Sequence, residues 1–169
     1  MNDSVPPATR TPEDTSPATR QAQDLLFFAY RDFTHAADVI LEELGLGRAH
    51  HRALHFIGRH PGIAVSELLS ILRITKQSLA RVLNELVDNG YVSQSPGLDD
   101  RRQRLLRLTQ DGATLEKRLF SRQHARIAAA FDAAGPAAVN GFRQVMRGIM
   151  DETARAWVDR GSRPSDEIP

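Results

Sequence analysis

Residues 74–112 read ITKQSLARVLNELVDNGYVSQSPGLDDRRQRLLRLTQDG, and this stretch decides how the chain folds. Its first part places leucines and valines three or four residues apart, which is typical of an amphipathic helix. Thr75 is a suitable N-cap for that helix, and Asp88-Asn89-Gly90 ends it. Two strand-like runs, 91–94 and 104–108, then flank a turn-rich, charged loop. We therefore predict a helix followed by a β-hairpin.

Two shorter helices are predicted just before this stretch. The first covers 48–59 and stops at His60-Pro61-Gly62, because proline keeps the residue before it out of the helical region. The second covers 65–72, and only Arg73 and Ile74 separate it from the next helix. Two helices joined by so short a turn form a helix-turn-helix, and the hairpin that follows is then its wing.

Long helices are predicted on both sides of this unit. Upstream, apolar residues recur at helical spacing through 23–44, and glycines follow them. Downstream, Thr109 is a suitable N-cap for a helix that Gly135-Pro136 breaks, and a last helix continues to Arg160. The sequence thus surrounds a small helical and β unit with helical arms.

The composition is that of an ordinary soluble globular protein. Of the 169 residues, 41% are hydrophobic and 25% are charged, which is sufficient for a buried core. The chain has no cysteine, so disulfides, thiolate zinc sites and thiol-based oxidation sensing are excluded. We find no apolar run long enough to span a membrane and no signal peptide, and therefore expect a cytoplasmic protein. Residues 1–22 hold four of the nine prolines and little apolar surface, so we expect a disordered tail there and a flexible tail over 161–169.

Positive charge is concentrated in the centre of the chain. Between Arg73 and Arg107, seven Lys and Arg residues stand against four Asp and Glu residues, whereas the whole chain has a net charge of only +1. A recognition helix enters the major groove of DNA N-terminus first, so its base-reading side chains are polar and lie in its first two turns. Glutamine can pair there with adenine, and lysine or arginine with guanine. The candidate DNA-contacting residues of this helix are Thr75, Lys76, Gln77, Ser78 and Arg81.

The segment DDRRQRLLRLTQDG, residues 99–112, resembles the most specific signature of the MarR family of regulators. That signature is Asp-x-Arg in the wing, then an apolar strand, then Leu-Thr-x-x-Gly. The resemblance covers roughly residues 23–160 and implies a mainly α fold: a winged helix-turn-helix with long N- and C-terminal dimerisation helices. It divides the chain into a dimerisation helix at 23–47, a DNA-binding domain at 48–109 and C-terminal dimerisation helices at 110–160.

The resemblance also implies how the protein acts. It predicts a homodimer that binds pseudo-palindromic operators in double-stranded DNA, with the two recognition helices about 34 Å apart. Binding would repress transcription until a small aromatic or anionic effector relieves it, and no cofactor is implied. In this family, a capping hydroxyl is usual where this chain has Ala64, so we expect the start of the helix at 65–72 to be less well fixed.

For the wing, the resemblance implies that Arg102 enters the minor groove of DNA and that Asp100 buttresses it. Arginine suits a narrow minor groove, where the negative potential is enhanced. Arg101 and Arg104 are better suited to phosphate contacts, which add affinity and salt dependence without sequence information.

Two further sets of residues are candidates for contacts other than DNA. The set expected at the dimer interface consists of Leu26, Phe33, Phe142, Ile149 and Trp157. The set expected near an effector, at the junction of the DNA-binding domain and the dimerisation helices, consists of Arg31, His35, His51 and His55.

Other interpretations of the same residues stay open at this point. Lys76 and Arg81 could belong to a solvated helix face, and the Asp-x-Arg pair of the wing could be a salt bridge within the hairpin. His51 and His55 are one helical turn apart and could face one metal ion, as in a metal-responsive regulator of the same fold. No carboxylate or His-Glu-x-x-His pattern accompanies them, so we assign no metal site.

Two other classes of protein are weaker alternatives. A non-specific architectural DNA-binding protein would have a stronger positive charge and no base-reading helix. An enzyme is not expected, because the sequence has no P-loop, dinucleotide fingerprint, Gly-x-Ser-x-Gly elbow or cysteine nucleophile.

Overall fold

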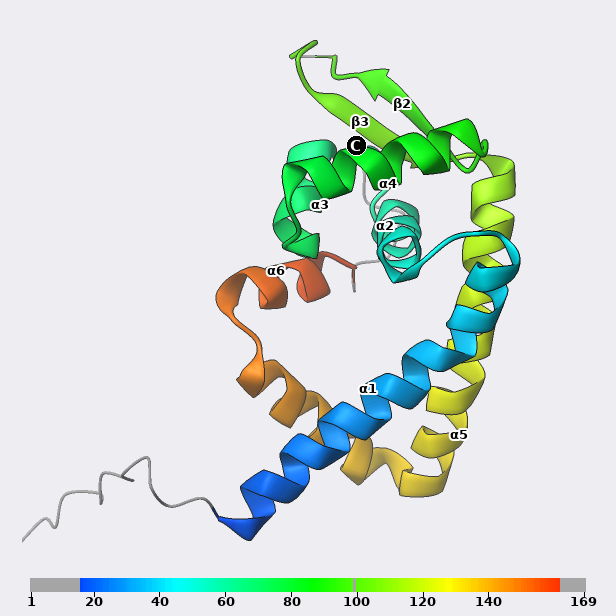
Figure 1. The fold of residues 1–169 in the computed structure, drawn as a ribbon. Coiled ribbons are helices and arrows are strands. Elements are labelled where there is room, and N and C mark those ends of the chain that lie inside the picture. Colours follow the sequence, from blue (N-terminus) through cyan, green and yellow to red (C-terminus); the bar gives the residue numbers. More distant parts are fainter. Residues whose placement is uncertain (1–15, 99, 162–169) are drawn as a thin grey trace, which may run out of the picture.

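Helices form most of the structure, and a small antiparallel sheet completes it. The computed structural model describes residues 16–98 and 100–161 (Figure 1). Its elements in chain order are α1 (Pro17–Glu43), α2 (Arg48–Arg59), β1 (Ile63–Ala64), α3 (Val65–Leu72), α4 (Lys76–Asp88), β2 (Val92–Pro96), β3 (Arg104–Leu108), α5 (Gln110–Ile149) and α6 (Glu152–Gly161).

The predicted unit at 48–109 is built around a leucine-rich core. Helix α2 packs against α3, α4 and strand β3, and the start of the next long helix, α5, packs against it as well. The core leucines are at most 1% exposed, and they are Leu54, Leu68, Leu79, Leu86 and Leu106. Because α4 contributes two of them, one of its faces is fixed on the core and the opposite face is left to solvent.

The sheet has the strand order β1-β3-β2, with antiparallel pairing throughout. Strand β3 begins and ends as predicted, whereas β2 lies slightly later in the chain than the predicted run at 91–94. Strand β1 was not predicted, because two buried residues are too few to show an alternating pattern. Its pairing of Ile63 with Leu106 attaches the start of α3 to the hairpin.

The start of α3 has no hydrogen bond from its N-cap side chain, as expected from Ala64, but other contacts hold it in place. Ala64 pairs with Leu105 in the sheet, and its N–H donates a hydrogen bond to the Glu67 carboxylate at 3.0 Å. Glu67 is the third residue of the helix, the position from which a glutamate can reach back to the N-cap N–H. One half of a capping box thus compensates for the missing hydroxyl.

Helix α1 begins at Pro17, six residues before the start that the apolar spacing predicted. The predicted disorder is therefore wrong for 17–22, and residues 1–15 lie outside the described part of the chain. Proline is favourable at the first position of a helix, and the Ala, Arg and Gln residues that follow are good helix formers. At its other end α1 stops at glycine as predicted: Gly45 has φ +68°, and the N–H of Leu46 donates to the carbonyl of Leu41 at 2.8 Å.

Helix α5 bends at Gly135, where φ is +79° and ψ is 167°, which confirms the predicted break. The prediction of a single last helix after that break is wrong, because the chain is interrupted again before α6. Asp151 accepts a hydrogen bond from the N–H of Ala154 at 2.8 Å, and this local cap favours a new helix start over continuation. Gly161, expected in the flexible tail, is the last residue of α6, and 162–169 lie outside the described residues.

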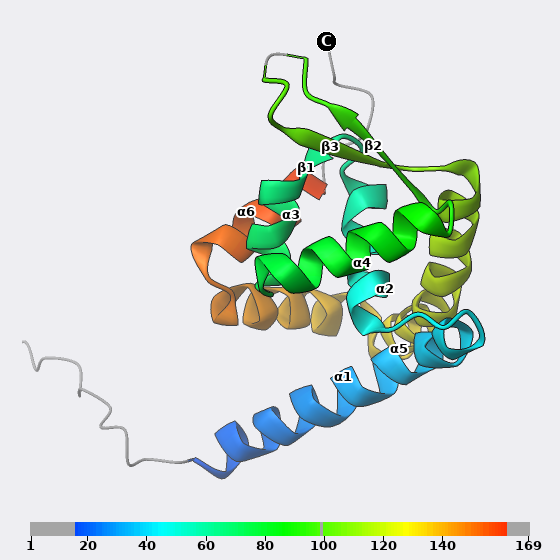
Figure 2. The same cartoon turned by 45° about the horizontal axis from the view of Figure 1, so that its top comes forward.

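The long helices carry the 48–109 unit at one end of the molecule. Helix α1 packs along α5, and the hairpin of β2 and β3 projects from the far side of the unit (Figures 1 and 2). After the bend, the chain returns to the unit and α6 lies beside α3 (Figure 2). There the ring of Trp157 contacts the ring of His60, with centroids 5.0 Å apart, and Nη1 of Arg160 lies 3.6 Å from Oε1 of Glu67.

Candidate nucleic-acid interface

The first two turns of α4 present polar side chains to solvent. Thr75 is its N-cap as predicted, since the threonine hydroxyl oxygen accepts the N–H of Ser78 at 3.1 Å. The other exposed candidates on this face are Lys76, Gln77 and Arg81, whereas Leu79 is buried on the core side. The predicted recognition residues therefore lie together on one accessible surface.

The turn between α3 and α4 is held by contacts from two other elements. Arg73 has φ +50°, the left-handed conformation that reverses the chain, and its N–H donates to the carbonyl of Leu69. From α2, Arg52 donates to the carbonyl of Leu72 at 2.8 Å, and the Arg73 guanidinium forms an ion pair with Asp151 ahead of α6. These contacts set the angle at which α4 leaves α3.

Arg81 is paired within its own helix. Its Nε donates to Oε1 of Glu85 at 2.8 Å, and the other carboxylate oxygen, Oε2, lies 2.7 Å from Nε2 of His50 on α2. The hydrogen bonds from Arg81 and then from His50 are the main causes that lower the pKa of Glu85. Glu85 is thus an anion at neutral pH on the same helix as Lys76 and Arg81, and the sequence analysis did not single it out.

The wing is a tight hairpin loop with arginines on its outside. Its closing hydrogen bonds run from the N–H of Gly97 to the carbonyl of Gln103 at 3.1 Å and from the N–H of Gln103 to the carbonyl of Asp100 at 3.0 Å. Asp100 accepts the backbone N–H of Arg102 at 2.9 Å. Among the described residues no ion pair joins their side chains, so the hairpin salt bridge is absent and Asp100 orders the backbone of Arg102 instead.

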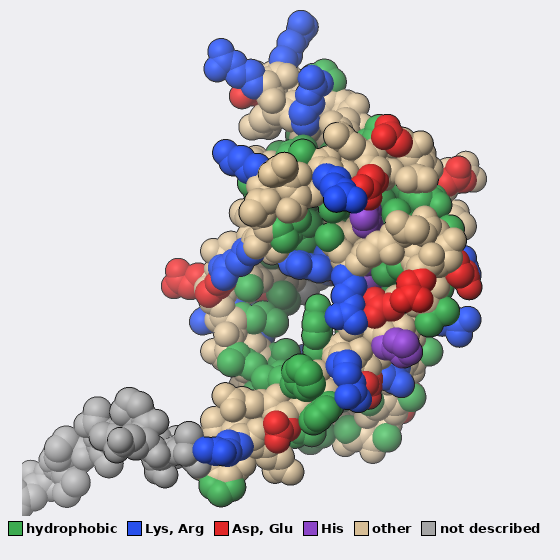
Figure 3. All heavy atoms as spheres, viewed as in Figure 1, with side chains coloured by type: hydrophobic (Ala, Val, Ile, Leu, Met, Phe, Trp, Pro, Cys, Tyr) green, Lys and Arg blue, Asp and Glu red, His purple; other side chains and the backbone are tan. Residues whose placement is uncertain are grey.

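Arg101, Arg102 and Arg104 are all exposed in the wing. Within residues 16–98 and 100–161, none of the three forms an ion pair. Lys and Arg side chains accordingly project from the tip of the hairpin, on the same end of the molecule as the exposed face of α4 (Figure 3). The structure therefore brings the predicted wing and helix residues to one surface.

The Leu-Thr-x-x-Gly segment, residues 108–112, joins the end of α4 to the start of α5 through hydrogen bonds. Thr109 accepts the N–H of Gly112 at 3.0 Å and donates its hydroxyl to the carbonyl of Gly90 at 2.6 Å. Its own N–H donates to the carbonyl of Tyr91 at 3.1 Å. A β-carbon at position 112 would lie 1.9 Å from that same Tyr91 oxygen, so only glycine permits this approach.

The candidate effector residues are only partly brought together. His51 and His55 lie on α2 beside α5, where Nδ1 of His55 is 3.8 Å from Oε1 of Glu116. Burial, and to a smaller extent His55, lowers the pKa of His51. On α1, His35 is exposed, and Arg31 pairs with the neighbouring Asp32 at 2.8 Å. In the described part of the chain, no three His, Asp or Glu side chains are placed to hold a metal ion together.

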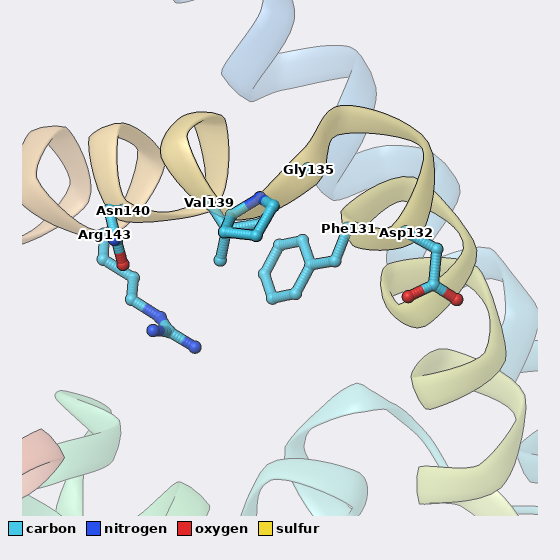
Figure 4. Close-up of a pocket in the computed structure, with 7 residues that line it drawn as sticks. Phe131, Asp132, Gly135, Val139, Asn140 and Arg143 are labelled. Carbon is cyan, nitrogen blue, oxygen red and sulfur yellow. The ribbon is translucent and has the colours of Figure 1, made fainter.

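A hollow of about 400 Å³ lies elsewhere, at the bend of α5. Figure 4 shows Phe131 before the bend and Arg143 after it reaching toward the same open side. None of the predicted effector residues lines this hollow, which is formed by Phe131, Asp132, Gly135, Pro136, Val139, Asn140 and Arg143. The Gly-Pro break was the sequence signal that could have indicated it.

Comparison with known proteins identifies the relatives of this chain. A model of the MarR family matches residues 44–103, which span the helix-turn-helix and most of the wing. The HTH-type transcriptional regulator PetP of Rhodobacter capsulatus is 50% identical over 141 residues, which cover 83% of this chain and 85% of PetP. The chain belongs to the MarR family of transcriptional regulators.

Solved MarR-family structures have the same fold. A SlyA-like transcription regulator from Listeria monocytogenes superposes with a TM-score of 0.65 at 22% identity, covering 85% of this chain and 96% of that one. A mutant MarR from Escherichia coli, complexed with operator DNA, superposes with a TM-score of 0.61 at 20% identity, covering 82% and 100% of the two chains. The mainly α winged-helix architecture predicted from the sequence is confirmed.

The MarR-family assignment gives the chain's class of function, and its homologues are regulators and not enzymes. No helix among the described residues combines the length and the apolar character needed to cross a bilayer. The residue-level assignments for DNA, effector and dimer contacts remain predictions.

Proposed function

We propose that this MarR-family regulator represses transcription by binding pseudo-palindromic operator DNA as a homodimer. The observation that carries the proposal is the joint exposure of the α4 face and the wing arginines at one end of the molecule. In the proposal Lys76, Gln77, Ser78 and Arg81 contact the major groove, and Thr75 fixes the helix start beside them. The related Escherichia coli protein solved with operator DNA supports this kind of partner.

In the wing, Arg102 would enter the minor groove, with Arg101 and Arg104 on the phosphates. The hydrogen bond from the Arg102 backbone to Asp100 supports this role, because it orders the loop through the backbone, and no residue of 16–98 or 100–161 forms an ion pair with the guanidinium. Phosphate contacts release counterions, so the affinity is expected to fall steeply with salt. The wing thus supplies affinity and groove-shape recognition, and α4 supplies base recognition.

A second copy of the chain would cover apolar side chains that one copy leaves exposed. Leu26, Phe142 and Ile149 are exposed on α1 and on α5 after its bend, and Phe33 is half-buried. Trp157 already packs against His60 of its own chain. In the proposed dimer only the part of its ring that faces away from His60 would contact the partner subunit. Two subunits present two recognition helices, as a pseudo-palindrome requires.

A small aromatic or anionic effector would act at the junction around His51 and His55. Such a ligand shifts the protein away from DNA only if it binds one arrangement of the two recognition helices more tightly than another. In the proposal the half-buried His51 of α2 supplies an aromatic contact, and the exposed His35 and Arg31 of α1 supply aromatic and cationic ones. The low net charge of +1 argues against the non-specific architectural alternative.

The test is selection of bound fragments from the source genome, followed by gel-shift titration of the enriched duplexes. Enrichment of a pseudo-palindromic sequence in promoter regions is the expected result. Uniform recovery of random DNA that weakens with salt would instead identify an architectural protein. Failure of the purified protein to retain any duplex would refute the proposal.

A further inference from the structure

The pairing of Arg81 with Glu85 is notable because it uses only one edge of the guanidinium. The Arg81 side chain is 82% exposed, and the ion pair engages its Nε. Arginine has five N–H donors in a planar fork, so the terminal amino groups stay available. A guanine in the major groove presents O6 and N7 to such an edge.

Glu85 is itself held from the other side. Nδ1 of His50 accepts the N–H of Gly47 at 3.0 Å, which places the ring proton of the neutral imidazole on Nε2. That Nε2–H points at Oε2 of Glu85, 2.7 Å away, and the His50 side chain is only 12% exposed. A continuous chain of hydrogen bonds thus runs from the start of α2 through His50 and Glu85 to Arg81.

We propose that Glu85, anchored by His50, is a positioning residue that presents the terminal amino groups of Arg81 to one base pair of each half-site. This rests on the proposed function, in which α4 lies in the major groove. A long arginine side chain loses rotamer freedom when it binds, and a side chain that is already oriented loses less. The carboxylate therefore contributes to base discrimination without touching DNA.

The same Glu85 carboxylate improves base discrimination but weakens the overall affinity for DNA. A negative charge on the helix that faces DNA repels phosphates, so removing it strengthens binding to every sequence. A purely structural surface residue would change affinity for all duplexes equally. The diagnostic property of a positioning residue is that discrimination falls while affinity for unrelated DNA rises.

The matched variants are Glu85→Ala and Asp88→Ala, which each remove one negative charge from α4. Asp88 is exposed near the end of the same helix, and no described interaction joins it to Arg81. Both are compared with Arg81→Ala and with the Arg81→Ala, Glu85→Ala double variant in the full-length protein. Binding is titrated against the selected operator and against duplexes that change one base pair of each half-site at a time.

We expect Arg81→Ala to remove about tenfold discrimination at one base pair per half-site. Glu85→Ala should reduce discrimination severalfold at that same base pair and should bind unrelated DNA more tightly. The double variant should lose no more discrimination than Arg81→Ala does. Asp88→Ala should gain affinity for unrelated DNA and keep full discrimination. His50→Asn provides a second variant: it keeps an acceptor for the N–H of Gly47, but its shorter side chain places no donor at Oε2 of Glu85, so discrimination at the same base pair should fall by a smaller factor.

Two results would overturn the inference: Glu85→Ala behaving like Asp88→Ala at every base pair, or Arg81→Ala weakening all duplexes equally, as a phosphate contact would. Wild-type protein that binds no operator at all would instead refute the proposed function, and the inference with it. Circular dichroism of each variant distinguishes lost positioning from a lost helix.

Discussion

At position 112 only a residue without a β-carbon fits. The β-carbon of an alanine would lie 1.9 Å from the Tyr91 carbonyl oxygen. Neither backbone can move away easily, because hydrogen bonds to Thr109 hold both Gly112 and Tyr91. We expect Gly112→Ala to lower the free energy of unfolding by about 3 kcal/mol, in the range of overpacked sites. Urea denaturation measures this loss.

The control is Gly141→Ala in the same helix, where nothing lies within 4 Å of the added carbon. Alanine is a better helix former than glycine, so this variant should be stabilised by up to about 1 kcal/mol. Equal stability of the two variants would contradict the docking of α5 against Tyr91.

Arg102 is the wing residue whose loss should matter most for operator binding. We expect Arg102→Ala to weaken binding at least tenfold, because the guanidinium is exposed and its backbone is held by Asp100. The dimer should stay intact, and gel-shift titration together with light scattering measures both properties. Arg118→Ala is the control, because it removes the same charge from α5, where Arg118 pairs with Glu43 of α1. Unchanged operator binding by the Arg102 variant would count against the wing contact.

At the scale of elements, the junction of α1, α2 and α5 should make stability depend on pH. Burial and, to a smaller extent, His55 lower the pKa of His51 in the folded protein, while Glu116 and Asp38 oppose this weakly. A lowered pKa means that the folded state binds this proton less readily than the unfolded state does. The stability it contributes is therefore complete above the unfolded value of about 6.5 and is lost as the pH falls through the folded pKa.

The corresponding prediction is that the free energy of unfolding decreases from pH 7 toward pH 5.5, and that His51→Gln flattens this decrease. Urea denaturation at a series of pH values measures it. A variant whose slope matches the wild-type slope would show that His51 is not the responsible group.

The start of α6 offers a graded test of how that helix is attached. The backbone N–H of Ala154 and then the Arg73 guanidinium lower the pKa of Asp151, so its carboxylate both caps α6 and pairs with the α3–α4 turn. Asp151→Asn keeps the cap and removes the charge pair, whereas Asp151→Ala removes both. Hydrogen exchange of the α6 amides should accelerate slightly in the first variant and strongly in the second. Equal rates in both would show that the cap does not hold the helix.

Elements with a local chemical signal were predictable from the sequence, and those defined by distant partners were not. Thr75, Thr109 and Gly135 mark helix ends through their own side chains or backbone freedom. Strand β1 exists only because Ile63 meets Leu106, and α6 is separate because Asp151 interrupts a run whose apolar spacing continues. In the same way the spacing of Arg81 and Glu85 is visible in the sequence, but the His50 that holds them is 35 residues away from Glu85.

At the scale of the whole molecule, the apolar side chains left exposed by one chain should determine assembly. Ile149 is 60% exposed after the bend of α5, so Ile149→Asp should leave the fold intact and convert a dimer to a monomer, as measured by light scattering. Leu98→Asp in the wing, where the leucine is 98% exposed, is the control and should remain dimeric. A wild-type protein that is monomeric at all concentrations would contradict the proposed assembly.

Helix α4 is attached to the same C-terminal segment before its start and after its end. Before α4, Arg73 pairs with Asp151, and after it, Gly90 accepts a hydrogen bond from Thr109. Between these two attachments the segment bends at Gly135 and leaves the helical conformation again at Met150. The orientation of α4 is therefore fixed before its start and after its end by one continuous segment, so a change in the bend at Gly135 would tilt the helix rather than release one of its ends.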